Sequence, residues 1–351
     1  MLGLRDHSTG GYAFNLRMAE ALKRAGHDVH TIHYNTIPLR YRGSRLRGSL
    51  HVMGSVVRDR PDLLIVSKSY SFMGPLRLLL PLLGVPVLYM VHHLEWHDRE
   101  ASVSDPRRTL VRWFIKSGDR IWVNSSCTAS DVSSLGIPGK RVSVVPPGYD
   151  PFPVVPYSER KLPVRIISVG TLCPRKDQLT LIKSCADLMD LNFQLHILGD
   201  EDAYPDYSAA VRELAETSRL GSRVFFHGHL PLEELRRIYG CSHILANLSR
   251  WEGYGMAVVD ALQSGLPVVA ANAGAVPELI DHGVQGYLVP PGDAKKCAEY
   301  LRDLISSGTL REELSSNAIE RAAELFTWEK TEQEFTKLAE SLVLVKENSI
   351  G

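Results

Sequence analysis

Arg250-Trp-Glu-Gly-Tyr-Gly-Met-Ala-Val-Val-Asp260 joins a predicted strand to a predicted helix and is the most informative segment of this chain. An apolar run at 243–249 precedes it and predicts a strand, and a helical pattern begins at Met256. Gly253 and Gly255 therefore stand in a strand-to-helix turn, where glycine allows a ligand to approach the backbone closely. The N–H groups of the first helical turn have no partner within the helix, so they favour an anion.

Two carboxylates bracket this turn. Glu252 stands directly before the glycines, and Asp260 follows eight positions later within the helix, a spacing of about two turns at 3.6 residues per turn. One acid can therefore hold one part of an elongated ligand while the other acid holds a different part. With the anion-binding helix start, the pair suits a sugar attached to a nucleoside diphosphate. A packing turn without any ligand is the alternative interpretation of Gly253-Tyr254-Gly255.

The composition is that of an ordinary globular protein and predicts two domains. The 351 residues exceed one typical core, and 44% of them are apolar and 23% charged. The formal net charge of +0 provides no overall field for nucleic acid, so we expect no nucleic-acid partner. The five cysteines show no Cys-x-x-Cys spacing, which argues against a zinc or disulfide framework and favours a cytoplasmic setting.

The longest apolar stretch, 76–91, does not predict a membrane span. Arg77, Pro81, Gly84 and Pro86 interrupt it, so it predicts a short helix followed by a strand. We also expect no signal peptide, because the start of the chain lacks the apolar segment that such peptides carry.

The chain opens with a Gly-rich loop that ends at Gly10-Gly11. A helix predicted at 12–25 and a strand predicted at 29–34 follow it, which is the start of a nucleotide-binding type of α/β unit. The strand that should precede the loop is reduced to residues 1–4, so the first strand is expected to be truncated.

Three histidines follow the strand predicted at 85–91. His92, His93 and His97 therefore stand where a parallel sheet binds ligands, beyond the carboxyl ends of its strands. We favour a functional role for His92, and a histidine held by structural hydrogen bonds is the alternative. A zinc site is disfavoured, because two of these histidines are adjacent and no Cys or further His follows at ligand spacing.

Four arginines crowd the segment 36–48, namely Arg40, Arg42, Arg45 and Arg47. A solvated loop is the simplest interpretation of this Arg40–Arg47 loop. The functional alternative is contact with an anionic acceptor or with an anionic membrane surface, which would make the protein peripheral at the membrane.

A Pro-rich stretch at 146–156 predicts a stiff linker, after which the α/β pattern restarts. A strand predicted at 164–170 leads to a loop with Arg175 and Lys176 and then to a helix at 178–189. An Asp-x-Asp pair at 200–202 follows an ordinary strand end, so a metal role for it is disfavoured.

Several motifs, in order along nearly the whole chain, resemble glycosyltransferase family 4. They are Gly10-Gly11, the segment 169–176, Trp251 to Gly255, Ser264 to Ala270, Val276 to Ile280, and Gly286 to Asp293. The resemblance implies a GT-B fold: two Rossmann-like, doubly wound α/β domains facing across a cleft. It implies an acceptor-side domain at 1–155, a nucleotide-sugar domain at 156–329, and a last helix at 330–351 that crosses back to the first domain.

The resemblance implies roles for individual residues. Glu252 matches the acid that contacts the donor sugar, and Asp260, usually Glu in the family, matches the acid that binds the ribose. Lys176, with Arg175 as a helper, matches the basic pair that neutralises the diphosphate. His92 matches the histidine that contacts the sugar near the reacting carbon.

The implied catalytic residues are accordingly His92, Glu252 and Lys176. The donor-binding set that the resemblance implies is Gly10, Gly11, Arg175, Lys176, Glu252, Gly253, Tyr254, Gly255, Met256 and Asp260.

The expected activity is that of a retaining hexosyltransferase. It would take a UDP- or GDP-sugar, need no metal or other cofactor, and act on an unknown glycan, lipid-linked or small-molecule acceptor in glycan biosynthesis. A nucleotide-sugar 2-epimerase of the same fold and an inactive sugar-nucleotide-binding relative are the alternatives.

Overall fold

The computed structural model describes residues 2–3, 10–33, 45–67, 84–94, 112–150, 155–156 and 160–350. The chain forms two compact units. The first takes in the described residues up to Gly148 and those from Phe326 onward, and the second takes in Tyr149–Leu325. These boundaries lie at 148/149 and 325/326, a few residues before the expected 155/156 and 329/330. Within the first unit, Gly148 packs closely on the backbone of Trp328, where an added Cβ would lie 2.3 Å from the Trp328 nitrogen.

The first unit contains a parallel sheet whose described strands run in the order β2-β1-β3-β4-β5-β6. Buried apolar runs form its central strands, as is usual for parallel strands covered on both faces. The strands are β1 (Leu2–Gly3), β2 (Ile32–His33), β3 (Leu64–Ser67), β4 (Val87–Val91), β5 (Arg120–Val123) and β6 (Val142–Val144). The short first strand is therefore in place, with Leu2 paired to both Ile32 and Val66.

The described helices of this unit include α1 (Gly10–Arg24), α3 (Arg45–Asp59), α6 (Ser126–Ser134), the 3₁₀ turn η4 (Gly139–Arg141) and α14 (Trp328–Ile350). The expected Arg40–Arg47 loop is partly wrong, because α3 already begins at Arg45 and includes Arg47. Arg40 and Arg42 lie outside the described residues.

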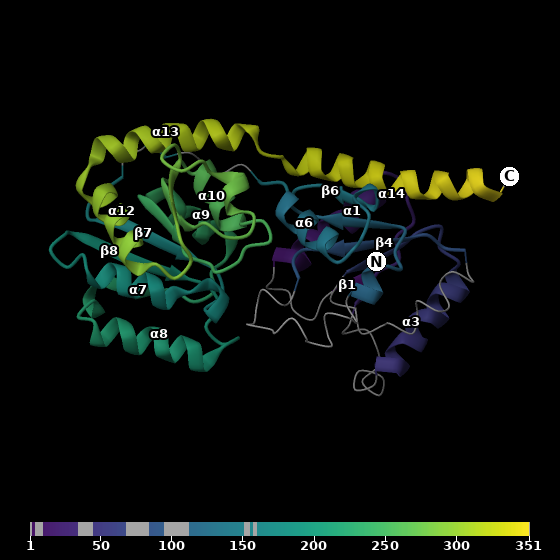
Figure 1. Ribbon diagram of the computed structural model, residues 1–351, viewed down its shortest axis with the longest axis horizontal. Helices are drawn as coiled ribbons and strands as arrows, with labels where there is room; N and C mark the ends of the chain where they lie inside the picture. Colours follow the sequence, from purple (N-terminus) through teal and green to yellow (C-terminus); the bar gives the residue numbers. More distant parts are fainter. Residues whose placement is uncertain are drawn as a thin grey trace. The chain divides into compact units, whose positions relative to one another are not determined.

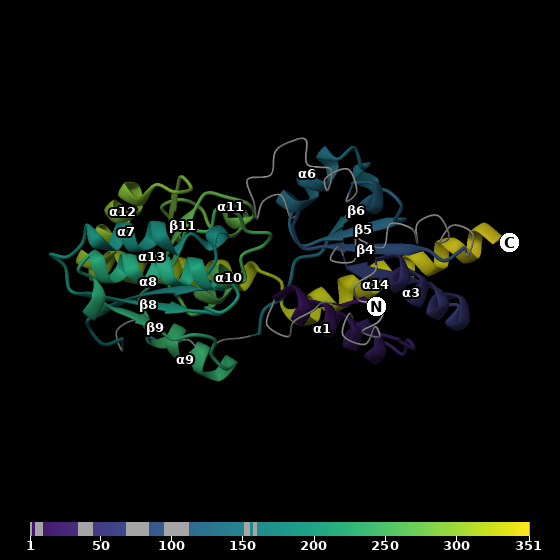
Figure 2. The ribbon, with the colours of Figure 1, turned by 90° about the horizontal axis from the view of Figure 1, so that it is seen from below.

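Helix α14 packs against α1, as the ribbon views show (Figures 1 and 2). Glu332 accepts hydrogen bonds from Arg17 at 2.8 Å and from Arg24 at 2.6 Å. Thr331 donates from its hydroxyl to the backbone oxygen of Pro146 at 2.8 Å. The return of the last helix to the first unit, expected from the resemblance, is therefore confirmed.

The second unit contains a parallel sheet in the order β12-β11-β10-β7-β8-β9. The direction of winding reverses between β7 and β10, and ligands of open α/β sheets bind beyond the strand ends at such a switch point. The strands are β7 (Val164–Val169), β8 (Phe193–Leu198), β9 (Val224–Phe226), β10 (Ile244–Asn247), β11 (Val268–Ala271) and β12 (Gly286–Val289).

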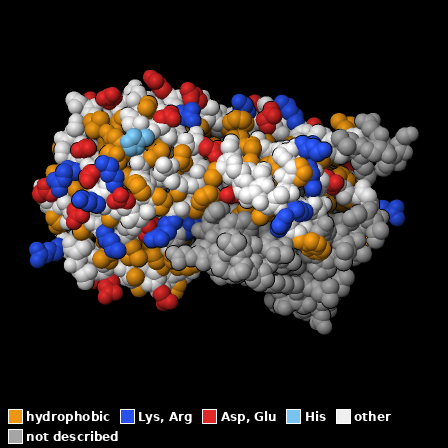
Figure 3. Space-filling model, viewed as in Figure 1, with side chains coloured by type: hydrophobic (Ala, Val, Ile, Leu, Met, Phe, Trp, Pro, Cys, Tyr) orange, Lys and Arg blue, Asp and Glu red, His pale blue; other side chains and the backbone are white. Residues whose placement is uncertain are grey.

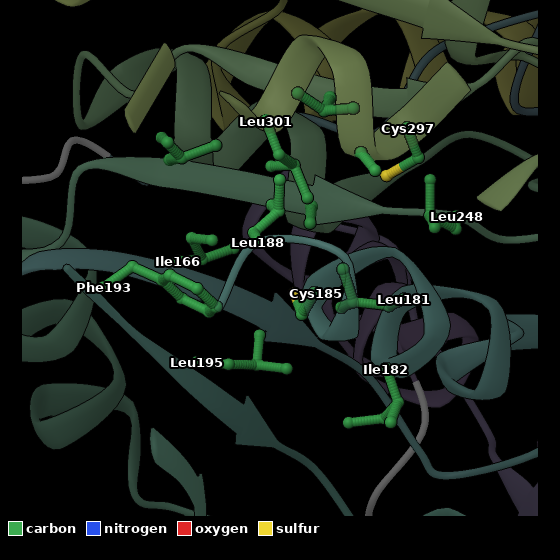
Figure 4. Packing of buried hydrophobic residues seen from close by; sticks show 14 of the residues in the cluster. Ile166, Leu181, Ile182, Cys185, Leu188, Phe193, Leu195, Leu248, Cys297 and Leu301 are labelled. Atoms are coloured by element: carbon green, nitrogen blue, oxygen red, sulfur yellow. The ribbon is translucent and has the colours of Figure 1, made fainter. Parts of the chain in front are cut away.

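Helices cover both faces of this sheet. On one face, α7 (Gln178–Ala186) and α12 (Ala294–Ser306) enclose a core that includes Cys185 and Cys297 (Figure 4). Helix α9 (Leu232–Cys241) lies on the opposite face of β8 and β9 (Figure 2). The other described elements are η6 (Pro174–Lys176), α8 (Pro205–Thr217), η7 (Gly221–Arg223), α10 (Met256–Gln263), α11 (Val276–Leu279) and α13 (Gly308–Glu324).

The described surface carries acidic and basic side chains together (Figure 3), in keeping with the zero formal charge. Within the described part of the chain, no helix is both long enough and apolar enough to cross a membrane.

Candidate active site

The loops after β7 and β10 meet at the switch point of the second sheet. The two strands are paired in parallel, with Leu245 opposite Ile167, so their carboxyl ends lie side by side. The backbone nitrogen of Arg250 donates to the oxygen of Arg175 at 2.7 Å, which joins the two loops. The β7 loop contributes Lys176 and the β10 loop contributes Glu252, so the expected basic pair and acid come together here.

Glu252 lies at the centre of this cluster and is only 6% exposed. Its Oε1 accepts from Lys176 Nζ at 2.5 Å and from the hydroxyl of Ser249 at 2.6 Å. Its Oε2 lies 3.5 Å from Arg175 Nη1, and the same guanidinium donates to the backbone oxygen of Trp251 at 2.8 Å. Both cations expected to bind a diphosphate therefore face a carboxylate in this structure.

The electrostatics of Glu252 follow from these neighbours. Burial by itself would raise the pKa of the carboxyl, but the positive charges of Lys176 and Arg175 outweigh burial and lower the pKa to about 2. The group is therefore a carboxylate at neutral pH, and its charge is offset by two cations. Such a carboxylate is a poor nucleophile and a good hydrogen-bond acceptor.

Lys176 reaches Glu252 by passing over Gly170. A Cβ added at Gly170 would lie 2.9 Å from Lys176 Cε, and the φ of Gly170 is +143°, in the region that favours glycine. Any larger residue would displace the lysine stem, so the strand end at Gly170 positions the ammonium group.

The turn between Glu252 and α10 has the form expected from its glycines. Gly255 has φ +105° and accepts from the backbone nitrogens of Val258 and Val259, which begins α10 at Met256 as predicted. The side chain of Tyr254 is 8% exposed and packs in the core with Val258. Burial, with a contribution from Glu278, raises the pKa of the Tyr254 phenol to about 12.

A second glycine outside the expected set supports the turn. Gly274, just before α11, has φ +60°, and a Cβ there would lie 2.1 Å from the backbone oxygen of Glu252. The next nitrogen, that of Ala275, donates to this same oxygen at 2.9 Å. The backbone position of Glu252 therefore depends on the absence of a side chain at Gly274.

Asp260 lies apart from this cluster, in a different environment. It is half-buried on α10, with Arg236 of α9 and Asp150 as charged neighbours. Burial raises the pKa of its carboxyl to about 7, Arg236 opposes this shift, and Asp150 adds to it. The group is thus near its titration midpoint at neutral pH, unlike Glu252.

The first unit brings together Gly11 and His92. A Cβ added at Gly11 would lie 3.3 Å from His92 Cδ2, so the head of α1 packs directly on the imidazole. The amide oxygen of Asn15 lies 3.0 Å from His92 Nε2, and Asn124 Nδ2 donates to the backbone oxygen of His92 at 2.8 Å. Gly10 is the first residue of α1.

The structure offers less support for a functional role of the other residues considered from the sequence. His93 is half-buried, and His97 lies outside the described residues. Asp200 Oδ1 accepts from the backbone nitrogen of Asp202 at 2.9 Å, which is a loop-forming contact. Among the described residues, no group of three His, Cys, Asp or Glu side chains is placed to hold a metal ion.

Sequence reasoning missed Ser249, Gly274, Asn15 and Asn124. Ser249 stands three residues before Glu252, and Asn15 stands about one helical turn after Gly11, so each spacing carried a weak signal. Gly274 and Asn124 approach their partners only through strand pairing, which the local sequence does not encode.

Two family models match the chain in succession. The model described as Glycosyltransferase Family 4 matches residues 10–151, and the model described as Glycosyl transferases group 1 matches residues 156–321. The D-inositol 3-phosphate glycosyltransferase of Corynebacterium efficiens is 28% identical over 258 residues, which cover 69% of this chain and 61% of that relative. The chain spans 59% to 63% of the length of the first curated relatives it matches.

Solved structures share the fold over nearly the whole chain. Sucrose-phosphate synthase from Thermosynechococcus elongatus aligns with a TM-score of 0.82 at 20% identity and covers 98% of this chain and 96% of its own. Anabaena Alr3699/HepE, in complex with UDP-glucose, aligns with a TM-score of 0.76 at 19% identity, covering 97% and 99%. The expected GT-B fold, with two parallel-sheet α/β domains, is confirmed.

Proposed function

Because this chain belongs to the group 1 glycosyl transferases of glycosyltransferase family 4, we propose that it moves a hexose-type sugar from a nucleoside diphosphate sugar to an acceptor hydroxyl. The observation that carries the proposal is the cluster of Arg175, Lys176 and Glu252 at the switch point of the second sheet. It supplies cations for a diphosphate and a carboxylate, ionised at neutral pH, for sugar hydroxyls at the place where such folds bind nucleotides.

The cations suit the leaving group. When the bond between the anomeric carbon and the phosphate oxygen breaks, negative charge builds on the diphosphate and positive charge builds on the sugar ring. Lys176 and Arg175, together with the N–H groups at the start of α10, would stabilise the diphosphate. Glu252 holds these cations until the donor arrives, and its carboxylate then accepts hydrogen bonds from the sugar.

We propose that the reaction retains the anomeric configuration without a covalent intermediate. Glu252 is a weak nucleophile, since Lys176, Arg175 and Ser249 all engage it. The acceptor oxygen would bond to the anomeric carbon on the face that the phosphate leaves. The proton of the acceptor hydroxyl would pass to the departing phosphate oxygen, so the nucleoside diphosphate leaves protonated.

We further propose that the reaction needs no divalent metal and that Asp260 and His92 contact the donor. The two cations make a divalent metal unnecessary for the leaving group. Asp260 would hold the ribose, and His92, backed by Gly11 and Gly10, would contact the sugar near its reacting carbon. UDP is the first nucleotide to test, because Anabaena Alr3699/HepE is solved with UDP-glucose, and GDP is the second.

The acceptor is proposed only by class, as a glycan, a lipid-linked sugar or a small polyol. The relative from Corynebacterium efficiens is named for an inositol phosphate, which is an anionic polyol. The arginines at 40–47 would suit an anionic acceptor or a peripheral membrane contact on the cytoplasmic side. This part of the proposal is tested separately, by liposome binding after replacement of all four arginines.

The test of the donor site is a thermal-shift panel of UDP, GDP, ADP and their sugar conjugates, with EDTA and then with Mg²⁺. We expect one nucleotide to stabilise the protein in EDTA, and Lys176→Ala to reduce the shift strongly at the same nucleotide concentration. Lys183→Ala, an exposed lysine on α7, is the matched control and should leave it unchanged.

Product analysis then separates the alternatives. A transferase releases some free sugar and nucleoside diphosphate by slow hydrolysis. A 2-epimerase changes the sugar while it remains on the nucleotide, and an inactive relative does neither. A shift that appears only with Mg²⁺ would count against the metal-independent mechanism.

A further inference from the structure

Asn15 is a buried polar residue that faces His92. It lies on α1, about one turn after Gly11, and is 3% exposed. Its amide oxygen is 3.0 Å from His92 Nε2. An amide oxygen can only accept a hydrogen bond, so Nε2 must carry the proton in this arrangement.

The ring of His92 is held on several sides. Met90 and Trp122 are paired across β4 and β5, so His92 and Asn124, two residues further on, lie on the same face of the sheet. Helix α1 covers that face. The rings of Phe14 and Trp122 meet the imidazole edge-on, with centroids at 5.4 Å and 5.0 Å.

A contribution to stability alone does not explain why an asparagine occupies position 15. Its amide nitrogen is fully buried and finds no hydrogen-bond partner among the residues that the structure describes. A buried polar group that lacks a partner destabilises a fold, so its presence calls for an explanation. The retained amide therefore points to a role directed at His92.

We propose that Asn15 is a positioning residue that fixes His92 in the tautomer protonated at Nε2, so that Nδ1 is the hydrogen-bond acceptor of the ring. In that state His92 accepts a hydrogen bond from a sugar hydroxyl and does not donate one to a phosphate oxygen. The second part of this proposal rests on the proposed function. The first part concerns the ring alone and is independent of any substrate.

The tautomer is measured without substrate. Protein labelled with ¹⁵N-histidine is studied by long-range ¹H–¹⁵N NMR at a pH where the ring is neutral, and His92→Gln assigns its signals. We expect a protonated-type shift at Nε2 and an unprotonated-type shift at Nδ1. Asn15→Leu should move both shifts toward intermediate values, whereas Asn15→Asp, which keeps the accepting oxygen, should preserve the pattern.

Two controls distinguish a positioning role of Asn15 from a purely structural role. Asn317→Leu, at an exposed amide of α13, should leave the His92 signals unchanged. The Tm of Asn15→Leu should stay close to that of the wild type, because the variant removes an unsatisfied buried amide nitrogen but also removes the acceptor of the His92 Nε2 proton. An unprotonated Nε2 in the wild type, or ring shifts in Asn15→Leu identical to those of the wild type, would overturn the proposal.

The functional half is tested by calorimetry with UDP and with UDP-glucose. Asn15→Leu should weaken UDP-glucose binding roughly two- to tenfold, as expected for one lost hydrogen bond, and leave UDP binding unchanged. Equal weakening of UDP and UDP-glucose binding would show that His92 contacts the phosphates. That result would refute the proposed hydrogen bond from a sugar hydroxyl. If the wild type binds no nucleotide, the proposed function fails, and the ring shifts still decide the tautomer.

Discussion

Lys176 Nζ lies 2.5 Å from Glu252 Oε1, although the two residues are 76 positions apart and belong to loops on neighbouring strands. The lysine stem passes over Gly170, and the Glu252 backbone is held by Gly274 and Ala275. Both ends of this ion pair are therefore positioned by glycines. A diphosphate that enters the site must compete with the carboxylate for the ammonium group.

This competition predicts opposite effects of the two partners on UDP binding. Lys176→Ala should weaken UDP binding about 10- to 100-fold, as expected for the loss of one charge-assisted hydrogen bond. Glu252→Gln should bind UDP at least as tightly as the wild type while losing sugar transfer, because the cations no longer face a carboxylate. Isothermal titration calorimetry measures both, and a loss of UDP binding in Glu252→Gln would contradict the competition.

Glu252 also predicts a loss of stability in acid. The pKa of its carboxyl is lowered in the folded state, from 4.5 to about 2, so the contribution is present above pH 4.5 and is lost as the pH falls toward 2. The pKa difference corresponds to about 3 kcal/mol. Urea unfolding between pH 2 and pH 6 should show a smaller pH dependence for Glu252→Gln than for Glu213→Gln, an exposed control on α8.

Asp260 predicts the reverse trend. The pKa of its carboxyl is raised from 3.8 to about 7, so the folded state holds a proton that the unfolded state releases. Its contribution is therefore lost as the pH rises from about 4 to 7. Asp260→Asn should raise the Tm at pH 8 more than at pH 4, and an equal change at both values would argue against the raised pKa.

Gly11 and Gly54 offer a matched pair of helical glycines. A Cβ at Gly11 would press on the His92 ring at 3.3 Å, whereas a Cβ at Gly54 in α3 would meet nothing within 4 Å. Gly54→Ala should stabilise the protein by about 0.5–1 kcal/mol through helix propensity. Gly11→Ala should stabilise the protein less than Gly54→Ala does, and it should lower the rate of sugar transfer by displacing His92. Chemical unfolding and the transfer rate are the two measurements.

Gly274 and Gly283 form a second pair, both with positive φ. A Cβ at Gly274 would lie 2.1 Å from the Glu252 oxygen, and a Cβ at Gly283 would meet nothing within 4 Å. Gly283→Ala should therefore cost only the conformational strain, about 1 kcal/mol. Gly274→Ala must also shift the Glu252 backbone, so its loss of unfolding free energy should clearly exceed that of the control. Comparable losses would show that the close approach is relieved cheaply.

The secondary-structure elements and the class of site could be predicted from local sequence patterns. Continuous apolar runs predicted the buried parallel strands, and glycine before an apolar helical pattern predicted the turn at Gly255 and the helix at Met256–Gln263. These features are local, because backbone preference and side-chain periodicity act over a few residues. They also sufficed to suggest the two α/β units and their family.

Which side chains contact one another depends on the folded chain and could not be predicted from local patterns. Lys176 faces Glu252 because β7 and β10 are neighbours at the reversal of strand order, and Asn15 faces His92 across 77 positions. Asp260 instead lies near Arg236 and Asp150, and Tyr254 packs inward. Strand order and helix packing bring distant residues together, and each pKa depends on those neighbours and on burial.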